Sequence, residues 1–267
     1  MQTIPLPTAK MIGAIEGGIG WVIFNHPERR NAVSLEMWQA IPTIMDALEA
    51  DPSVRVIVLR GTGGQAFVSG ADISEFERVR ATPAQVVAYE AVSGEAQRRL
   101  KQTTKPTIAM IEGFCIGGGM GIAIGTDLRV ASANATFAIP AAKLGLGYGA
   151  DGIKVLIDLV GPSFAKEIFY TARQFTAEEA TRMGLVNRVV PVEALDATVR
   201  AMAGMIAENA PLTVKAVKIC VGEIVKGPQA MDQALCDQVV ETCFASADYI
   251  EGRRAFMEKR KPAFQGR

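Results

Sequence analysis

Three consecutive glycines at residues 117–119 constrain this chain of 267 residues more than any other feature of its sequence. Glycine loses more backbone freedom on folding than any other residue, so an ordered run of three needs a structural or chemical reason. The tract follows an apolar strand predicted over residues 107–111 and a turn at residues 112–113, and it precedes a buried helix predicted to end near Asp127. A strand that breaks into glycines and then opens a helix presents free backbone N–H groups and the positive end of the helix dipole.

Such a helix start suits a carbonyl oxygen that gains negative charge during a reaction, because N–H groups donate to it and no side chain blocks its approach. The alternative is a close contact between helix and sheet that only glycine allows. The tract is neither a G-x-G-x-x-G motif nor a Walker P-loop, since no Gly-Lys-Ser/Thr follows it. A second stretch, AFVSGADI at residues 66–73, also runs from a short apolar strand through small residues into a predicted helix. Two such turns predict a pair of converging N–H donors, which an oxyanion hole requires.

With both turns present, the sequence resembles the crotonase superfamily, the enoyl-CoA hydratase/isomerase family, over nearly the whole chain. The motifs that carry the resemblance are NHPERRNA at residues 25–32, FVSGAD at 67–72, IGGGMG at 116–121, TAEEA at 176–180, GLV at 184–186 and FMEKR at 256–260. It implies an α/β fold, the crotonase-type spiral of ββα turns, with a helical C-terminal region through which relatives form trimers. Two trimers commonly stack in relatives, so the expected protein partner is a second copy of the chain, in a homotrimer or homohexamer.

The order of predicted elements agrees with one large α/β core and a helical appendage. Strands and helices alternate through the first two thirds of the chain, and the last third is predicted to be helical throughout. We expect a spiral core with the acyl-CoA site over residues 1–200 and a helical oligomerisation region over residues 201–267. Ser34 is predicted to cap a helix that begins at Leu35, and helices within residues 74–101 are predicted to cover the acyl pocket.

Composition argues against several classes of protein. The 28 basic and 28 acidic side chains balance, and no stripe of Lys and Arg is interleaved with aromatic residues, so we expect no nucleic-acid partner. Four cysteines without C-x-x-C spacing and a single histidine predict no metal site and favour a reducing compartment. The start MQTIPLPTAK does not resemble a secretory signal, and no apolar run reaches about 18 residues, so we expect a cytoplasmic protein without a membrane partner.

The resemblance places the two oxyanion donors at the backbone N–H groups of Ala71 and Gly118. They would bind a thioester carbonyl as it gains enolate character, and such donors contribute about 3–4 kcal/mol each in acyl-transfer enzymes. The alternative is that both are only tight turns. Asp72, which follows the first donor, is predicted to cap the helix at Ile73. No cofactor is implied, because the coenzyme A thioester is the substrate.

The resemblance also implies contacts with coenzyme A. Arg29 and Arg30 fall in a loop that contacts the 3′-phospho-ADP in relatives, and the planar guanidinium group suits phosphate. Phe256 and Lys259 match C-terminal residues that relatives use for coenzyme A, often across a subunit boundary. On sequence alone the alternatives are a solvated basic pair and an ordinary amphipathic helix end. The other residues expected to line the coenzyme A and substrate site are Ala32, Ser69, Ala71, Asp72, Ile73, Gly117, Gly118, Ala141 and Tyr148.

The sequence departs from the family's hydratases at both catalytic carboxylates. Those hydratases place one glutamate a helical turn after the oxyanion glycine, where this chain has Gly121. Their second glutamate follows a proline 20 residues further on, where this chain has Ala141. Hydration needs a base to activate water and an acid to protonate carbon, and neither Gly nor Ala supplies a proton-transfer group. We therefore expect inefficient hydration of a simple 2-enoyl-CoA.

Other side chains are candidates for the missing proton-transfer group: Lys143, Tyr148, Asp151, Glu75 and Glu77. Asp151 is the candidate catalytic carboxylate, and the alternative is an N-cap for a helix that begins at Gly152. For Glu75 and Glu77 the alternative is an ordinary solvated helix charge.

Two functions stay open on the sequence. The first is an acyl-CoA-processing enzyme of the lyase or isomerase class that stabilises a thioester enolate and decarboxylates, hydrolyses or isomerises its substrate. The second is a protein that binds acyl-CoA without turnover. A nucleic-acid-binding member of the family has little support, because the formal net charge is zero.

Overall fold

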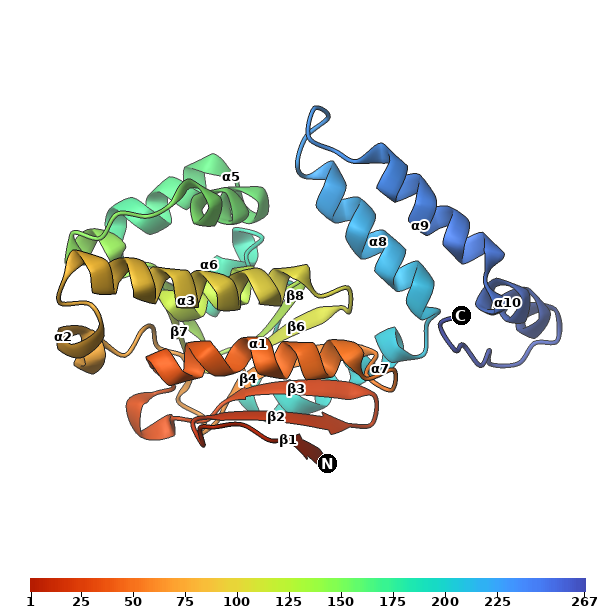
Figure 1. The fold of residues 1–267 in the computed structure, drawn as a ribbon, viewed down its shortest axis with the longest axis horizontal. Helices are drawn as coiled ribbons and strands as arrows, with labels where there is room; N and C mark the ends of the chain where they lie inside the picture. The colour runs from red at the N-terminus through yellow and green to blue at the C-terminus, as the bar shows by residue number, and fades with distance from the viewer.

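Two β-sheets form the framework of the computed structural model, which describes all 267 residues (Figure 1). The larger sheet has seven strands in the order β1-β2-β3-β4-β6-β8-β11, and the smaller has four in the order β10-β9-β7-β5. The strands are β1 (Gln2–Ile4), β2 (Met11–Glu16), β3 (Ile19–Phe24), β4 (Val56–Gly61), β5 (Ala66–Val68), β6 (Thr107–Ile111), β7 (Phe114–Ile116), β8 (Leu128–Ser132), β9 (Thr136–Ala138), β10 (Phe175–Thr176) and β11 (Arg188–Val190).

The larger sheet is antiparallel at one edge and parallel through its centre. Strands β1, β2 and β3 pair antiparallel, whereas β3, β4, β6, β8 and β11 pair in parallel. Gly17 and Gly18 join β2 to β3 with φ angles of 58° and 82°, the left-handed conformations that a two-residue hairpin turn needs. The central strand β6 reads TIAMI and is buried throughout, because helices cover both faces of a parallel sheet.

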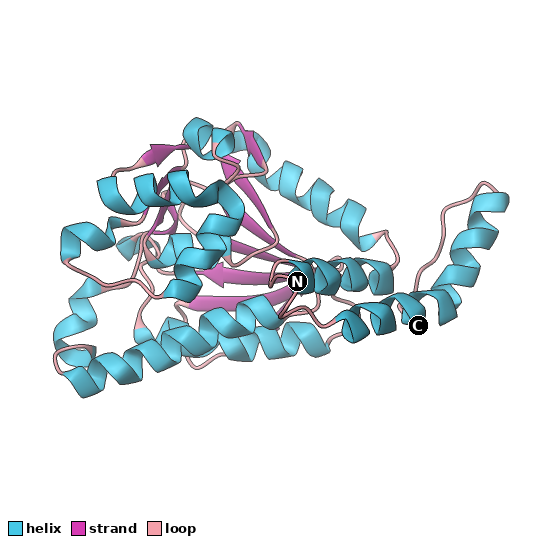
Figure 2. Ribbon diagram, turned by 90° about the horizontal axis from the view of Figure 1, so that it is seen from above, coloured by secondary structure: helices cyan, strands magenta, loops and turns pink.

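The chain has ten α-helices, of which several pack on the two faces of the larger sheet and the last three project beyond it (Figures 1 and 2). They are α1 (Leu35–Ala50), α2 (Phe76–Val79), α3 (Pro83–Gln102), α4 (Gly118–Ile124), α5 (Ala150–Thr171), α6 (Ala177–Arg182), α7 (Leu195–Ala207), α8 (Pro211–Ile224), α9 (Gln233–Ala245) and α10 (Ala247–Met257). Alternate residues of β3 separate two apolar cores: Val22 and Phe24 pack in the core that contains α1, while Trp21 and Ile23 pack in the core that contains α7. The predicted α/β fold is confirmed.

The boundary expected after residue 200 falls inside α7. Leu195, Val199 and Ala203 of this helix are all buried in the second apolar core, so α7 covers the sheet and is not part of an appendage. The helices that project beyond the sheet begin with α8 (Figures 1 and 2). The division into a spiral core and an oligomerisation region stays a prediction, and its boundary moves to the α7–α8 connection.

Three short strands, β1, β7 and β10, lie in stretches that were not predicted as strands. Strands of two or three residues are too short to show a measurable alternation of apolar and polar side chains. Among them, β7 matters most, because it precedes the glycine tract and pairs in parallel with both β5 and β9. It therefore sets where the tract lies relative to the other glycine turn.

The predicted helical segment after the first glycine turn is present in several pieces. A 3-10 helix over Ile73–Glu75 leads into α2, and α3 begins after Thr82. Thr82 and Gln85 form a capping box, in which the Thr82 side chain accepts from the Gln85 N–H and the Gln85 side chain accepts from the Thr82 N–H. No helix is both long and apolar enough to cross a lipid bilayer.

Candidate active site

The two glycine turns lie beside each other because strands β5 and β7 are parallel neighbours. Both turns follow the carboxyl ends of their strands, so they meet at one edge of the smaller sheet. A Cβ atom built on Gly118 would lie 3.7 Å from the backbone N of Ala71 and 3.7 Å from the carbonyl C of Gly70. Hydrogen bonds hold the first turn on both sides of Ala71, since Val33 N donates to Gly70 O at 2.8 Å and Asp72 N donates to Val33 O at 3.0 Å.

The glycines of these turns serve different purposes. Gly70 and Gly117 have φ angles of 123° and 54°, which residues with a side chain rarely adopt. Gly119 has no room for a side chain, because its Cβ would lie 2.1 Å from the carbonyl O of Val68. A Cβ on Gly118, in contrast, would meet no atom closer than 3.6 Å. A Cβ would make only ordinary van der Waals contacts there, so the packing of the chain does not itself require glycine at position 118.

The backbone N–H groups of Ala71 and Gly118 have no hydrogen-bond partner within the chain. Gly118 is the first residue of α4, so its N–H has no acceptor within the helix. Neither N–H is a donor in the backbone hydrogen bonds made by the turns, caps and loops of the chain. Two free donors next to each other, with no side chain between them, form an arrangement that stabilises a developing oxyanion.

The far end of α4 is held by Arg129, which the sequence interpretation missed. Its guanidinium group is buried and donates to Thr126 O at 2.6 Å and to Leu185 O at 2.7 Å. Burial lowers the pKa of Arg129 to about 10, so the group is still protonated at neutral pH. A cation at the C-terminal end of a helix complements the helix dipole, so Arg129 stabilises the helix that presents the Gly118 N–H. A lone arginine inside the apolar strand LRVAS was the available signal.

Asp72 caps the 3-10 helix over Ile73–Glu75, as predicted. Its Oδ1 accepts from Ser74 N at 3.1 Å and from Ser74 Oγ at 2.6 Å. The cap holds the chain immediately after the Ala71 N–H, and the side chain of Ile73 remains 66% exposed.

Glu75 takes the capping role that was expected of Ser34. The backbone N of Leu35, the first residue of α1, donates to Glu75 Oε2 at 3.0 Å. Ser34 is the N-cap residue of α1 by position, as predicted, but its hydroxyl is buried without a hydrogen-bond partner and makes no capping bond. Glu75 also pairs with Arg78 at 2.8 Å, while Glu77 is exposed on α2. Glu75 therefore has a structural role, because its carboxylate accepts a hydrogen bond at the start of α1.

The loop with the two predicted phosphate-binding arginines is fastened to the first glycine turn. Arg29 and Arg30 are exposed, and Ser69 N donates to Arg30 O at 3.2 Å. The buried Asn31 anchors the loop, because its side chain accepts from His26 N at 2.9 Å and donates to two carbonyl oxygens. Arg30 and Asn31 adopt left-handed φ angles of 52° and 56°, which asparagine tolerates well. Asn31 is a second structural residue that the sequence interpretation did not single out.

Comparison with known proteins agrees with this geometry. The model of the family described as Enoyl-CoA hydratase/isomerase matches residues 14–267 of the chain. The chain is 36% identical to a short-chain-enoyl-CoA hydratase of Clostridium acetobutylicum, over 92% of this chain and 94% of that protein. It is 35% identical to a crotonyl-CoA hydratase of Syntrophomonas wolfei, over 90% and 92%. A solved enoyl-CoA hydratase/carnithine racemase structure from Magnetospirillum magneticum superposes with a TM-score of 0.93 at 35% identity, covering 97% of each chain.

The chain belongs to the enoyl-CoA hydratase/isomerase family. Gly121 and Ala141, the positions at which the resemblance predicts the hydratase glutamates, carry no carboxylate. A Cβ built on Gly121 would have only two atoms of other elements within 4 Å, Gln97 Oε1 at 3.8 Å and Tyr148 OH at 3.9 Å. Ala141 is buried in the 3-10 helix Pro140–Leu144. Both positions are occupied by residues that transfer no proton, and neutral polar groups surround the first of them.

The two side chains near the Gly121 Cβ position come from either side of α4 in the sequence: Gln97 precedes this helix and Tyr148 follows it. Tyr148 lies in the glycine-rich loop before α5, and its ring packs edge-on against Phe169 with centroids 4.8 Å apart. Burial raises the pKa of the Tyr148 hydroxyl, so it remains a hydrogen-bond donor at neutral pH. Gln97 is half-buried on α3. Tyr148 was expected in the substrate site, whereas Gln97 was missed, because nothing local in a helix of polar residues marks one glutamine.

One of the two interpretations of Asp151 was an N-cap for a helix that begins at Gly152, and the structure does not have this cap. Helix α5 begins at Ala150, its N-cap residue is Gly149, and Asp151 is an exposed residue of the first turn. An acidic side chain there stabilises the helix through the dipole. Asp151 is also absent from the 4 Å surroundings of the Gly121 Cβ position. Its catalytic role stays a prediction, as does that of the exposed Lys143.

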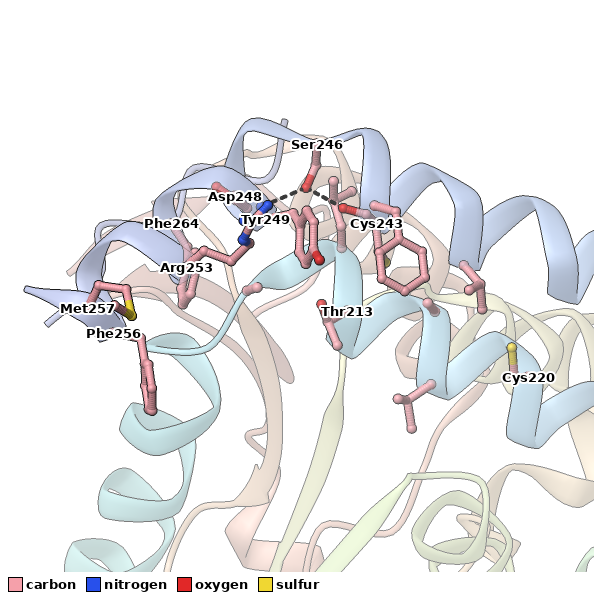
Figure 3. A pocket seen from close by; sticks show the side chains of 17 residues that line it. Thr213, Cys220, Cys243, Ser246, Asp248, Tyr249, Arg253, Phe256, Met257 and Phe264 are labelled. Carbon is pink, nitrogen blue, oxygen red and sulfur yellow. Dashed lines mark hydrogen bonds between the residues drawn. The ribbon is translucent and has the colours of Figure 1, made fainter.

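Phe256 and Lys259 lie at the opposite end of the molecule from the glycine turns, on and just after α10 (Figure 1). Phe256 is 82% exposed and contributes to an apolar cavity of about 920 Å³ between α8, α9 and α10. Figure 3 shows Tyr249 of α10 pointing toward α8 across this cavity. Within one copy of the chain these residues do not reach the Ala71 and Gly118 donors.

The single histidine and the cysteine before the glycine tract are both structural. His26 is 6% exposed, and its Nδ1 lies 3.4 Å from Ala32 O, next to the arginine loop. Burial raises the pKa of the Cys115 thiol far above its ordinary value, which leaves it unreactive. No group of three or more His, Cys, Asp or Glu side chains is arranged to hold a metal ion.

Proposed function

We propose that this family member binds an acyl-CoA and stabilises the enolate of its thioester between the N–H groups of Ala71 and Gly118. The observation that carries the proposal is the pair of neighbouring, unpartnered N–H donors: the Gly118 Cβ position lies 3.7 Å from Ala71 N, and neither N–H donates within the chain. The loop with Arg29 and Arg30 adjoins the first donor turn and suits the phosphates of coenzyme A.

The reaction we favour uses the oxyanion donors without the two hydratase carboxylates. Loss of CO2 from a malonyl-type thioester meets this condition. The bond between C2 and the carboxylate carbon breaks, its electron pair forms the enolate with negative charge on the thioester oxygen, and CO2 leaves. Water then gives a proton to C2, which forms a new C–H bond in place of the broken C–C bond and leaves hydroxide. Hydrolysis or isomerisation would need another proton-transfer group, for which Asp151 is the candidate carboxylate.

Hydration of a short enoyl-CoA is the competing function, because two relatives carry the names short-chain-enoyl-CoA hydratase and crotonyl-CoA hydratase. Against it stand Gly121 and Ala141, which supply neither the base nor the acid of that reaction. Binding without turnover is the third possibility.

A screen that follows the mass of each thioester separates these functions. The purified protein is mixed with crotonyl-, longer enoyl-, malonyl-, methylmalonyl- and 3-oxoacyl-CoA. We expect loss of CO2 or hydrolysis of a thioester while crotonyl-CoA keeps its mass. Gain of water on crotonyl-CoA would contradict the proposal, and unchanged masses with intact binding would favour the non-catalytic function.

We also propose that the chain assembles into a homotrimer, or a homohexamer of two stacked trimers, in the cytoplasm. Large apolar side chains of the projecting helices are exposed in one copy, among them Phe244, Ile250, Phe256 and Met257. Such an exposed surface favours a protein partner. In an assembly, Phe256 and Lys259 would contact the coenzyme A of a neighbouring copy. Light scattering should give a multiple of the 28.5 kDa chain mass, and a monomer at micromolar concentration would contradict this part.

A further inference from the structure

The indole ring of Trp38 lies against the Gly118 donor. Trp38 belongs to α1 and is 2% exposed, and its Cζ2 atom is the nearest atom of another element to the Gly118 Cβ position, at 3.6 Å. The backbone N of Ala71 lies 3.7 Å from the same position. One edge of the ring and the first donor turn therefore flank the same point, and the ring forms part of the wall beside the oxyanion donors.

A buried hydrogen bond holds this ring to helix α3, which packs against α1 (Figure 1). The Trp38 Nε1 donates to the Tyr89 hydroxyl at 3.0 Å, and Tyr89 is itself buried. The N–H is the only polar group of a tryptophan side chain, so this bond restrains the rotation of the ring. Burial raises the pKa of the Tyr89 hydroxyl, which keeps it neutral. A helix that was predicted to cover the acyl pocket is thus bonded to a side chain beside the donors.

Tyr89 is in turn held by Arg80, which lies at the end of α2. The Arg80 guanidinium carbon lies 4.8 Å from the centroid of the Tyr89 ring and 4.8 Å from that of the Phe76 ring. It also pairs with Glu90 at 2.6 Å, although its side chain is only 14% exposed. Cation–π attraction to two rings and an ion pair act on one guanidinium group. These contacts hold Tyr89 in place as the acceptor for the indole N–H.

A second bond joins the same segments within one turn of α1. The backbone N of Leu35, three residues before Trp38, donates to Glu75 Oε2. Glu75 ends the short 3-10 helix that follows the Ala71 donor turn, and α2 begins at the next residue. The first donor turn, the start of α1 and the helices after the turn are therefore connected by hydrogen bonds at two points.

An aromatic edge suits a place beside a developing negative charge. The rim of an aromatic ring carries partial positive charge, and a ring that occupies this volume keeps water from the donors. Hydrogen bonds to an oxyanion are stronger where water is excluded, because the effective dielectric constant is lower. A tryptophan that only fills the core would contribute to the free energy of unfolding and would not affect a bound thioester.

We propose that Trp38 is a positioning residue of the oxyanion site, and that the Tyr89 hydroxyl holds its ring in place beside Gly118. This inference rests on the proposed function, because it takes the Ala71 and Gly118 N–H groups to bind the thioester oxygen. It adds two side chains to a site that backbone groups supplied, and it couples the position of α3 to the stabilisation of the enolate.

The enolate of acetoacetyl-CoA tests the inference through a spectroscopic signal. This enolate absorbs in the near ultraviolet and the keto form does not, so the difference absorbance at fixed pH and saturating protein gives the enolate-to-keto ratio of the bound thioester. Wild-type protein should raise this ratio above that of free acetoacetyl-CoA, because the two donors stabilise the enolate. The mass of the thioester is checked after each measurement, so that turnover is not mistaken for enolisation.

Two variants assign the effect to the named side chains. Trp38→Phe removes the indole N–H and the outer edge of the ring, while Tyr89→Phe removes only the acceptor hydroxyl and keeps the test open if the first variant does not fold. Each should lower the enolate-to-keto ratio of the bound thioester about three- to tenfold, the value of one hydrogen bond. Thermal unfolding of every variant reports whether it folds.

The chain offers a matched control for each variant. Tyr170→Phe removes the same hydroxyl from a ring that is 75% exposed on α5. Trp21→Phe changes the other tryptophan of the chain, which is buried in the apolar core that contains α7. Both controls should keep the wild-type ratio.

The outcomes separate the inference from the proposed function. Wild-type ratios in folded Trp38→Phe and Tyr89→Phe proteins would overturn the inference alone, and so would an equal loss in Trp21→Phe. A loss in only one of the two test variants would overturn the link between Trp38 and Tyr89. If the wild-type protein does not bind acetoacetyl-CoA, or binds it without raising its enolate-to-keto ratio, the proposed function itself fails.

Discussion

The site has two halves that differ in what they retain. The half around Ala71 and Gly118 keeps two unpartnered N–H donors, the strained glycines that shape them and the buried Arg129 behind α4. The half around Gly121 and Ala141 has no carboxylate at either position, although the resemblance to the family's hydratases predicts a glutamate at each. Charge stabilisation and proton transfer are thus separable parts of this architecture, and the chain keeps the first without the usual form of the second.

The largest effect should come from restoring the second half. Gly121→Glu together with Ala141→Glu should increase hydration of crotonyl-CoA by about 10²- to 10⁴-fold, because general acid–base groups contribute that much. A side chain at 121 has room, since its Cβ would have no contact closer than 3.8 Å. Gly121→Gln with Ala141→Gln is the matched control, with similar volume and no proton-transfer group. Equal rates for the two double variants would show that the halves are not separable.

Removing a donor from the first half should produce the next largest effect. Gly118→Pro deletes one oxyanion N–H at the first position of α4, where proline is tolerated in a helix, and should lower turnover about 10²- to 10³-fold. The measurement is the rate on whichever thioester the wild-type protein converts, with thermal unfolding as a check of the fold. A folded variant that retains wild-type activity would remove Gly118 from the proposed mechanism.

The arginine loop should affect binding and leave the chemistry unchanged. Arg29→Ser with Arg30→Ser should raise KM about tenfold at low salt while kcat changes little, because exposed charge pairs contribute up to about 1 kcal/mol each. The difference from wild type should shrink as salt is added. Arg98→Ser is the control, since Arg98 is also exposed but pairs with Glu95 on α3. A fall in kcat without a change in KM is the result that would contradict a role in binding coenzyme A.

The smallest effect should come from the cap beside the first donor. Asp72→Ala removes the acceptor for Ser74 and should lower the free energy of unfolding by about 1 kcal/mol. Asp72→Asn keeps an acceptor oxygen and should recover most of this loss. Denaturant unfolding measures both variants, and equal destabilisation by alanine and asparagine would mean that the cap hydrogen bond is not the stabilising contact.

Local backbone requirements made the first half predictable. A glycine that must adopt a positive φ, such as Gly70 or Gly117, leaves its mark in the sequence itself, and so does an aspartate that caps the turn after it. The α/β class was also predictable, because the apolar runs of the central strands and the amphipathic helices follow from neighbouring residues. Short strands such as β7 were not predicted, since three residues are too few to show an alternation of apolar and polar side chains.

Side-chain destinations were not predictable in the same way. Glu75 has the sequence position of a first-turn helix charge, yet it caps α1 across a long separation in the chain, and the serine expected there is left without a partner. The boundary expected after residue 200 falls inside α7 for a related reason, because the apolar face of a helix does not show from the sequence which surface it will cover. Such choices depend on which elements the fold brings together.

The sequence by itself determined that the chain has two glycine turns able to present free N–H groups and that positions 121 and 141 carry no carboxylate, because both are properties of residues at single positions. Only the tertiary structure decided what lies beside Gly121 in their place. Gln97 comes from α3 and Tyr148 from the loop before α5, and they meet near α4 through packing between segments that are distant in the chain. Backbone conformation is set locally, whereas the surroundings of a reacting atom are set by the whole fold.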